Sequence, residues 1–183
     1  TKLSWEEYFP LFYSNTQGYT YYFGKRIYDR IKSNKDIVNQ FIDKSLNAVR
    51  GTKREQINIS VLSGFIHDMD DELKNEIYDK IERDEDLCFL LFNLISQHSP
   101  NLNQFDRLFQ LVDDGKCNLS NFEQIRFGSL NGLNKEDFVV LSNKFFKYGN
   151  SGYHIAFDVL FTASGNNHEL KKELAPILKE CIY

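Results

Sequence analysis

The chain has 183 residues, of which 22 are Lys or Arg and 26 are Asp or Glu, and its formal net charge is −4. Its 42% hydrophobic and 26% charged residues exclude a disordered chain, and its 3 Pro and 10 Gly disfavour a turn-rich β-sandwich or a collagen-like chain. The longest apolar run, Leu87 to Phe92, is far shorter than the roughly 20 residues that span a bilayer, and no signal-peptide pattern opens the chain. Three widely spaced cysteines argue against a disulfide framework or a zinc site and favour a reducing compartment, so we expect a cytoplasmic protein.

The N-terminal part of the chain, residues 1–56, is rich in aromatic side chains. Ten of the aromatic residues fall within the first 28 positions: Trp5, Tyr8, Phe9, Phe12, Tyr13, Tyr19, Tyr21, Tyr22, Phe23 and Tyr28. Two helices are predicted near residues 20–32 and 36–50. Repeat arrays need an atypical terminal unit to cover their first apolar face, so we expect residues 1–56 to form a helical N-terminal cap. The alternative is a docking surface for an upstream domain or a partner.

From Arg54 onward, apolar residues recur three and four positions apart, and polar turns interrupt them at intervals of roughly 12 to 16 residues, which is typical of helices. Several turns have the spacing of a helix-capping box: Thr52 with Glu55, Ser120 with Glu123 and Asn134 with Asp137. Acidic residues 70–72 open another predicted helix, where the helix dipole favours negative charge. No stretch alternates apolar and polar residues over several positions. We therefore expect an all-α chain.

The predicted helices repeat with a period of roughly 33 residues. Four columns of residues keep this spacing to within one position: Leu73, Phe105, Phe138 and Leu170; Ile77, Phe109, Ser142 and Leu174; Leu62, Leu94, Phe127 and Val159; and, in the turns, Met69, Asn101, Asn134 and Asn166. Two helices per period predict stacked helical hairpins, because a two-helix unit cannot cover its own apolar stripe.

The tetratricopeptide and ankyrin patterns are missing, and the loosely patterned helix pairs resemble a HEAT-like repeat array over about residues 57–183. Pro176, inside the last predicted helix, is similar to the proline of the kinked first helices in that family. The resemblance implies a right-handed stack of about four helical hairpins, an α-solenoid, continuous with the cap. Because the chain begins with Thr1, we expect a fragment of a longer protein. The structural alternative is an irregular helical bundle.

Charge changes along the chain. Residues 1–56 have a net charge of +4, residues 57–115 of −9 and residues 116–183 of +1. One interpretation is an acidic middle surface that attracts a basic partner, and the other is a set of solvated helix faces that keep the array in solution.

Short motifs do not indicate catalysis. The His67-Asp68 pair resembles the core of HD-type metal phosphohydrolases, but no histidine precedes His67 to complete the metal ligands. A calcium loop counted from Asp68 has Leu73 where Gly is needed. The remaining histidines lack ligand spacing, and no phosphate-binding glycine motif occurs. We read residues 149–152 as a tight turn between helices. We expect a non-enzymatic chain without catalytic residues, metal or cofactor.

Polar residues recur in step on the second helix of successive hairpins, at Asn93, Arg126 and Asp158. Solenoids expose one helix of each pair along a shared inner surface, so we predict that these residues bind a partner. The other interpretation is that they are ordinary exposed positions.

The expected function is protein–protein or interdomain interaction within a larger intracellular protein, with a protein partner or an upstream domain of the same chain. One alternative is nucleic-acid binding, since HEAT-like arrays include alkylpurine DNA glycosylases, but the net charge of −8 over residues 57–183 disfavours it. A second alternative is a small acidic inhibitor or immunity-type protein, which the acidic stretch from Glu82 to Asp86 supports.

Overall fold

The computed structural model describes residues 9–14, 20–127, 130, 132–165 and 168–182. These residues form ten α-helices and two short 3₁₀ helices, η2 and η3, and the described part contains no strand, which confirms the predicted all-α class. The chain divides into two compact units, unit 1 (Thr1–Leu90) and unit 2 (Leu91–Tyr183). Each unit has its own buried core.

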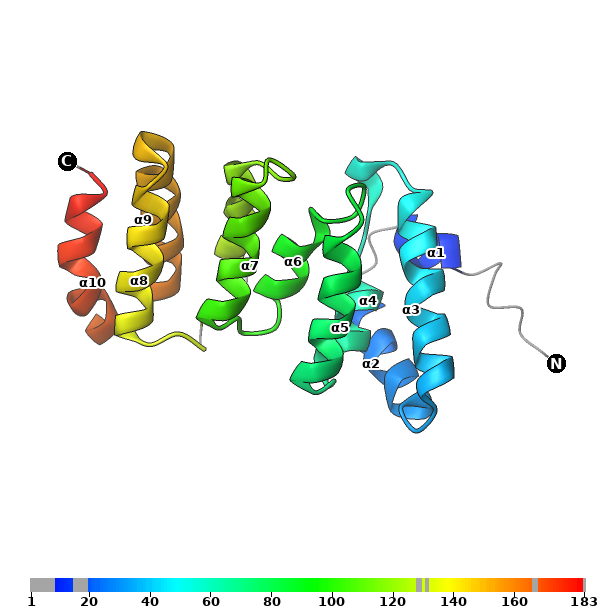
Figure 1. Ribbon diagram of the computed structural model, residues 1–183. Helices are drawn as coiled ribbons and strands as arrows, with labels where there is room; N and C mark the ends of the chain where they lie inside the picture. Colours follow the sequence, from blue (N-terminus) through cyan, green and yellow to red (C-terminus); the bar gives the residue numbers. More distant parts are fainter. Residues whose placement is uncertain (1–8, 15–19, 128–129, 131, 166–167, 183) are drawn as a thin grey trace. The chain divides into compact units, whose positions relative to one another are not determined.

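Unit 1 contains five α-helices, coloured from blue to green in Figure 1. They are α1 (Phe9–Ser14), α2 (Thr20–Ile31), α3 (Lys35–Arg50), α4 (Ser60–His67) and α5 (Asp71–Glu82), with η2 (Arg54–Gln56) between α3 and α4. The bounds of α2 and α3 confirm the helices predicted near residues 20–32 and 36–50.

The aromatic residues near the N-terminus differ in exposure. Phe9, Tyr13 and Tyr28 are buried, whereas Tyr22 and Phe23 are exposed. The ring of Phe9 lies 5.3 Å from that of Phe41 on α3, which stacks at 4.1 Å on Phe65 of α4. Trp5, Tyr8 and Tyr19 lie outside the described residues. Some of the described aromatic residues therefore belong to the core of unit 1, while others face solvent.

Helices α2 and α4 pack closely where two glycines face the opposite backbone. A Cβ atom at Gly24 would lie 2.1 Å from the carbonyl oxygen of Val61, and one at Gly64 would lie 1.9 Å from that of Tyr21. Any other side chain would force the two backbones apart. This crossing joins residues on both sides of position 56 into one compact unit.

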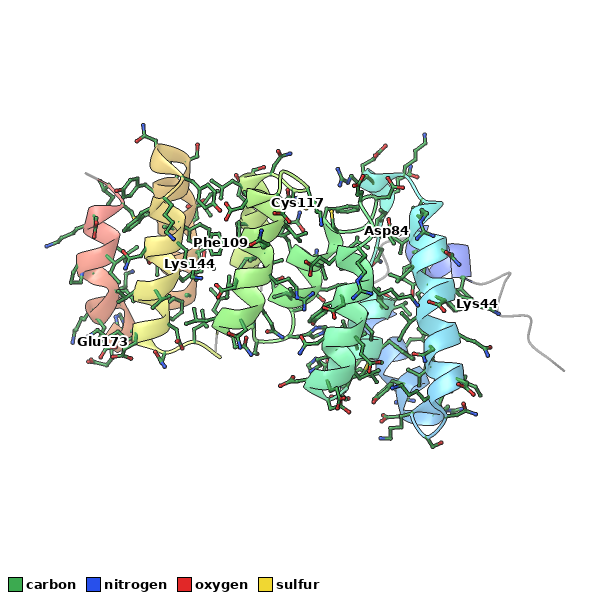
Figure 2. The ribbon with its side chains drawn as sticks, in the orientation of Figure 1. Lys44, Asp84, Phe109, Cys117, Lys144 and Glu173 are labelled. Atoms are coloured by element: carbon green, nitrogen blue, oxygen red, sulfur yellow. The ribbon has the colours of Figure 1, made fainter. Side chains whose placement is uncertain are left out.

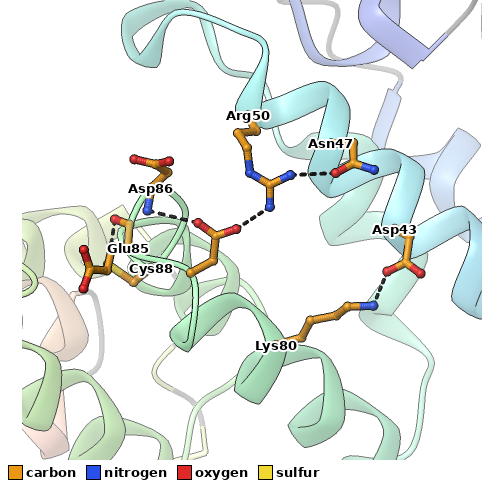
Figure 3. Close-up of polar contacts among 8 residues, drawn as sticks. Asp43, Asn47, Arg50, Lys80, Glu85, Asp86 and Cys88 are labelled. Atoms are coloured by element: carbon orange, nitrogen blue, oxygen red, sulfur yellow. Dashed lines mark hydrogen bonds and ion pairs between the residues drawn. The ribbon is translucent and has the colours of Figure 1, made fainter.

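Helices α3 and α5 are bridged by ion pairs that run in the same order along both helices. The pairs are Lys35 with Glu76, Asp43 with Lys80, and Arg50 with Asp84 just after α5. Figure 2 labels Asp84, and Figure 3 draws the last two pairs. Because both residue numbers rise together, the two helices are parallel. Figure 3 also shows Arg50 donating a hydrogen bond to Asn47 one turn earlier, at 2.6 Å, which holds the guanidinium toward α5.

Unit 2 contains five helices that lie wholly within it and most of α6 (Leu90–Ser96), coloured from green to red in Figure 1. They are α7 (Leu102–Asp113), η3 (Leu119–Phe127), α8 (Lys135–Phe146), α9 (Gly149–Ser164) and α10 (His168–Glu180). Pro176 lies inside α10, as the sequence predicted.

Four phenylalanines from four different elements form the core of unit 2. Phe122 of η3 lies 5.0 Å from Phe92 of α6, 4.6 Å from Phe109 of α7 and 4.9 Å from Phe145 of α8, measured between ring centroids. These contacts join segments that are far apart in sequence, so the cluster fixes η3 against the neighbouring helices. Large aromatic rings contribute much of the apolar area that such a core buries.

Helices α7 and α8 repeat the polar contacts of α3 and α5. Lys144 pairs with Asp106, and the hydroxyl of Tyr148 donates to Asp113 at 2.5 Å. Figure 2 shows Lys144 beside Phe109, whose ring centroid lies 5.9 Å from Nζ.

Two of the contacts in each unit are separated by similar distances along the sequence. The step from Asp43 to Asp106, and that from Lys80 to Lys144, is about twice the repeat period. The same step relates Arg50 to Asp113 and Asp84 to Tyr148. The polar contacts between parallel helices therefore recur after two periods of the sequence.

Four helices begin with an Asn or Asp side chain that accepts a backbone hydrogen bond: Asn34 before α3, Asp70 before α5, Asn101 before α7 and Asn134 before α8. The predicted capping box of Asn134 with Asp137 is confirmed, and so are the acidic start of α5, which Asp70 caps, and the turn at Met69. Such a cap stabilises a helix by about 1 kcal/mol.

Three predictions about turns are wrong. Thr52 caps no α-helix, because its hydroxyl donates to the carbonyl of Ala48 at 2.9 Å and η2 follows. Ser120 lies inside η3, where Asn121 accepts from the backbone of Asn118. Residues 149–152 form the first turn of α9 rather than a loop.

The repeat columns coincide largely with buried positions in the described part. Ile77, Phe109, Ser142 and Leu174 are all buried, and so are Leu62, Leu94 and Val159. Phe105 and Phe138 are buried, whereas Leu73 and Leu170 are half-buried. Asn166 and the side chain of Phe127 lie outside the described part. The three cysteines, Cys88, Cys117 and Cys181, are buried.

Candidate protein-binding surface

The three residues predicted to bind a partner lie on three elements of unit 2. Asn93 is on α6, Arg126 in η3 and Asp158 on α9. The contact of Phe92 with Phe122 joins α6 to η3, and η3 in turn packs against α9. The side chain of Arg126 lies outside the described part, so a face shared by all three residues stays a prediction.

Asn93 is half-buried and takes part in local contacts. Its side-chain oxygen accepts a hydrogen bond from Gln97, and its carbonyl accepts one from the Ser96 hydroxyl at 2.8 Å. Both partners lie within the next turn of the chain. These bonds hold the Asn93 side chain close to its own helix.

Asp158 lies on the face of α9 that points away from the core. Helix α9 buries Ile155, Ala156, Val159 and Leu160, which fall on one side at helical spacing. Asp158 and its sequence neighbour Phe157 are half-buried, and Phe161, three residues after Asp158, is 51% exposed. Asp158 therefore lies on the same turn of α9 as the exposed Phe161.

Three aromatic residues spaced four positions apart form a row along α9, which we call the aromatic row: Tyr153, Phe157 and Phe161. Phe157 and Phe161 are nearly parallel, with centroids 5.7 Å apart and 12° between their planes. Tyr153 stacks at 4.4 Å on Phe146 of α8, which fixes the first ring of the row. Residues four apart on a helix are neighbours on its surface, so the row covers two turns of α9.

A cation lies over the exposed end of the aromatic row. Nζ of Lys171, on α10, lies 5.0 Å from the ring centroid of Phe161. A cation over an aromatic face is attracted by the ring's negative quadrupole, by about 0.5–1 kcal/mol at exposed sites. The surface thus combines an exposed ring and the carboxylate of Asp158 on α9 with a positive charge on α10.

The sequence reasoning missed the aromatic row. The regular spacing of Tyr153, Phe157 and Phe161 is visible in the sequence, but Ile155, Val159 and Leu160 make α9 apolar on the opposite side as well. Only the packing against η3, α8 and α10 decides which side is buried.

The His67-Asp68 pair lies in unit 1, at the end of α4. The His67 ring contacts Tyr21 edge-on at 5.6 Å, and Asp68 pairs with Lys25 at 3.1 Å. Burial, together with the nearby charge of Lys25, lowers the pKa of His67 below its usual 6.5. In the part of the chain that the structure describes, no cluster of three or more His, Cys, Asp or Glu residues could hold a metal ion.

No α-helix formed by the described residues has the length and hydropathy needed to cross a bilayer. Comparison of the chain with protein-family models, curated proteins and solved structures finds no match.

Proposed function

We propose that this chain is a non-enzymatic helical repeat module that binds a protein partner through the aromatic row of α9. The observation that carries the proposal is Phe161, a large aromatic residue that is 51% exposed although its helix is anchored in the core of unit 2. Asp158 and Lys171 provide polar contacts beside it.

The chemistry of this surface suits protein recognition. Binding energy at protein interfaces concentrates in a few anchors, which are enriched in aromatic residues and surrounded by polar contacts. Phe157 and Phe161 offer two adjacent rings on a helix whose backbone is already fixed, so little conformational entropy is lost when a partner binds. A partner with an apolar anchor and both charges, able to pair with Asp158 and Lys171, fits the surface best.

The proposed repeat architecture is an α-solenoid of helical hairpins. Two features support it: the Asn or Asp caps at the start of α3, α5, α7 and α8, and the polar contacts that recur after two periods. The caps lie 36, 31 and 33 residues apart, near the predicted period of roughly 33 residues.

Affinity capture with matched variants tests the proposal. The purified chain, immobilised through its C-terminus, is exposed to a cell extract, and retained proteins are quantified by mass spectrometry against empty resin. Phe161→Asp and Asp158→Lys are the test variants. Val140→Asp is the control, because Val140 is an exposed apolar residue on α8 outside the aromatic row.

The proposal predicts at least one protein that the wild type and Val140→Asp retain equally and that both test variants lose about tenfold or more. Circular dichroism must show unchanged helix content in all variants. Retention of the same proteins by every variant, or of none above empty resin, would refute it.

A further inference from the structure

Unit 1 contains a small apolar pocket at the junction of three helices. It encloses about 230 Å³ and is lined by Phe9 of α1, Ile27 and Ile31 of α2, and Ile37 and Phe41 of α3. Ile37 is 45% exposed, so this apolar lining reaches the surface. Pockets for small organic ligands usually measure about 300–1,000 Å³, so this one is the size for one or two large side chains of a peptide.

The polar residues at the pocket come from α3. Gln40 and Lys44 complete the lining; Gln40 lies three residues after Ile37, and Lys44 lies three residues after Phe41. The amide of Gln40 can hydrogen-bond a peptide backbone, and the ammonium of Lys44 attracts a carboxylate.

Basic residues lie beside the pocket on α2, while α3 has Lys44 in the lining and the exposed Asp36 next to Ile37. Arg30 follows Ile27 by three residues on α2, which places it along the same edge of the helix, and Arg26 lies one turn before Arg30. Both arginines are exposed, and within the described residues neither forms an ion pair. The acidic residue between them, Asp29, is paired with Lys32 at 3.0 Å.

We propose that this pocket binds a short helical segment of a partner protein that carries large apolar side chains flanked by Asp or Glu. The apolar side chains enter between α2 and α3, and the acidic residues pair with Lys44 on one wall and with Arg30 on the other. An amphipathic helix presents apolar residues three or four apart on one face and charged residues beside them, which matches this layout. The site is in unit 1 and does not depend on the aromatic row of α9.

A peptide selection on the full chain tests this. A phage-displayed library of 12-residue peptides is selected on the immobilised wild type, and the enriched peptides are synthesised with a fluorescent label. Their affinities are measured by fluorescence anisotropy at 0.15 M salt for four variants. Ile37→Asp places a negative charge at the apolar entrance of the pocket, and R30E/K44E reverses the two basic charges beside it. K172E/K179E reverses two exposed charges on α10 and is the charge-matched control. Phe161→Asp removes the exposed ring of the aromatic row.

The expected peptides carry two large apolar residues three or four positions apart, together with Asp or Glu. Their affinity falls about tenfold with Ile37→Asp and with R30E/K44E, and less than about twofold with K172E/K179E and Phe161→Asp. Retained binding by Phe161→Asp separates this site from the one proposed on α9.

Three results would overturn the proposal. The first is a selection without enrichment, and the second is a set of enriched peptides that bind Ile37→Asp as well as the wild type. The third is binding of the chain to phosphatidylserine vesicles that R30E/K44E abolishes while acidic peptides do not bind, since a basic apolar surface of that kind would be a membrane contact.

Discussion

The crossing of α2 and α4 gives the sharpest test of the packing in unit 1. Replacing Gly64 by Ala would place a methyl group 1.9 Å from the carbonyl oxygen of Tyr21, where ordinary contact begins near 3.4 Å. The obstacle is backbone inside a helix, so it cannot rotate away as a flexible side chain would. The two helices must separate by about 1.5 Å at this point.

The cost of Gly64→Ala follows from two opposed effects. Overpacking a close interface costs about 1–3 kcal/mol, and here it lies at the upper end because backbone meets backbone. Ala gains up to about 1 kcal/mol over Gly in intrinsic helix propensity. We expect a net loss of about 2 kcal/mol, which for a unit of this size lowers the Tm by about 10 °C.

Thermal unfolding followed by circular dichroism and calorimetry measures this loss. Gly51→Ala is the matched control, because the nearest atom to its added Cβ lies 3.6 Å away and φ is −78°, so we expect little change or a small gain. In the double variant G24A/G64A, one separation of the helices relieves both clashes, so the loss should be well below the sum of the two single losses. A Tm for Gly64→Ala equal to that of Gly51→Ala would refute the described crossing.

Other features give further predictions. Asn101→Ala removes the cap of α7 and should cost about 1 kcal/mol in denaturant unfolding, whereas Asn103→Ala, two positions further in, should cost at most a few tenths; equal losses would contradict the cap. His67 has a pKa below 6.5 in the folded state because burial disfavours its charged form, so its contribution to stability is present above pH 6.5 and declines as the pH falls below that value. His67→Gln should therefore lose less stability than the wild type between pH 7 and pH 5.5, and parallel pH profiles would show that another group is responsible. Tyr148→Phe removes the 2.5 Å hydrogen bond to Asp113 and should cost about 1 kcal/mol, with α8 remaining helical by circular dichroism.

The helices themselves could be predicted because their causes are local. The spacing of apolar residues on α2 and α3, and the Asn134–Asp137 capping box, depend on neighbours within one or two turns. The capping-box spacing of Thr52 with Glu55 gives a wrong prediction, because the Thr52 hydroxyl donates to the helix that precedes it instead of capping a new helix. A hydroxyl at such a position can bond either to the helix before it or to the backbone after it, and the sequence does not show which of these two hydrogen bonds forms.

The closest packing could not be predicted, because its partners are distant in sequence. Gly24 and Gly64 lie on helices separated by the whole of α3, and neither has a neighbour in the sequence that identifies the other as its counterpart. The same limit applies to the aromatic cluster around Phe122, which gathers residues from α6, α7 and α8 onto a 3₁₀ segment.

The candidate surface stays a prediction, and the sequence indicated only one of its residues. The repeat spacing placed Asp158 on a second helix, at a position open to a partner, and the structure has it on the side of α9 that points away from the core. The spacing gave no reason to choose Phe161, since α9 carries apolar residues on both sides, and its exposure depends on how α10 packs against α9.

The burial of all three sulfur atoms makes site-specific labelling of this chain straightforward. Burial raises the pKa of the Cys181 thiol to about 11, so almost none of it is thiolate at neutral pH, and Cys88 and Cys117 are also shielded from reagents. Maleimides react with the thiolate. A cysteine introduced at the exposed Asn150 on α9 should therefore take up a fluorophore selectively, without prior removal of the natural cysteines.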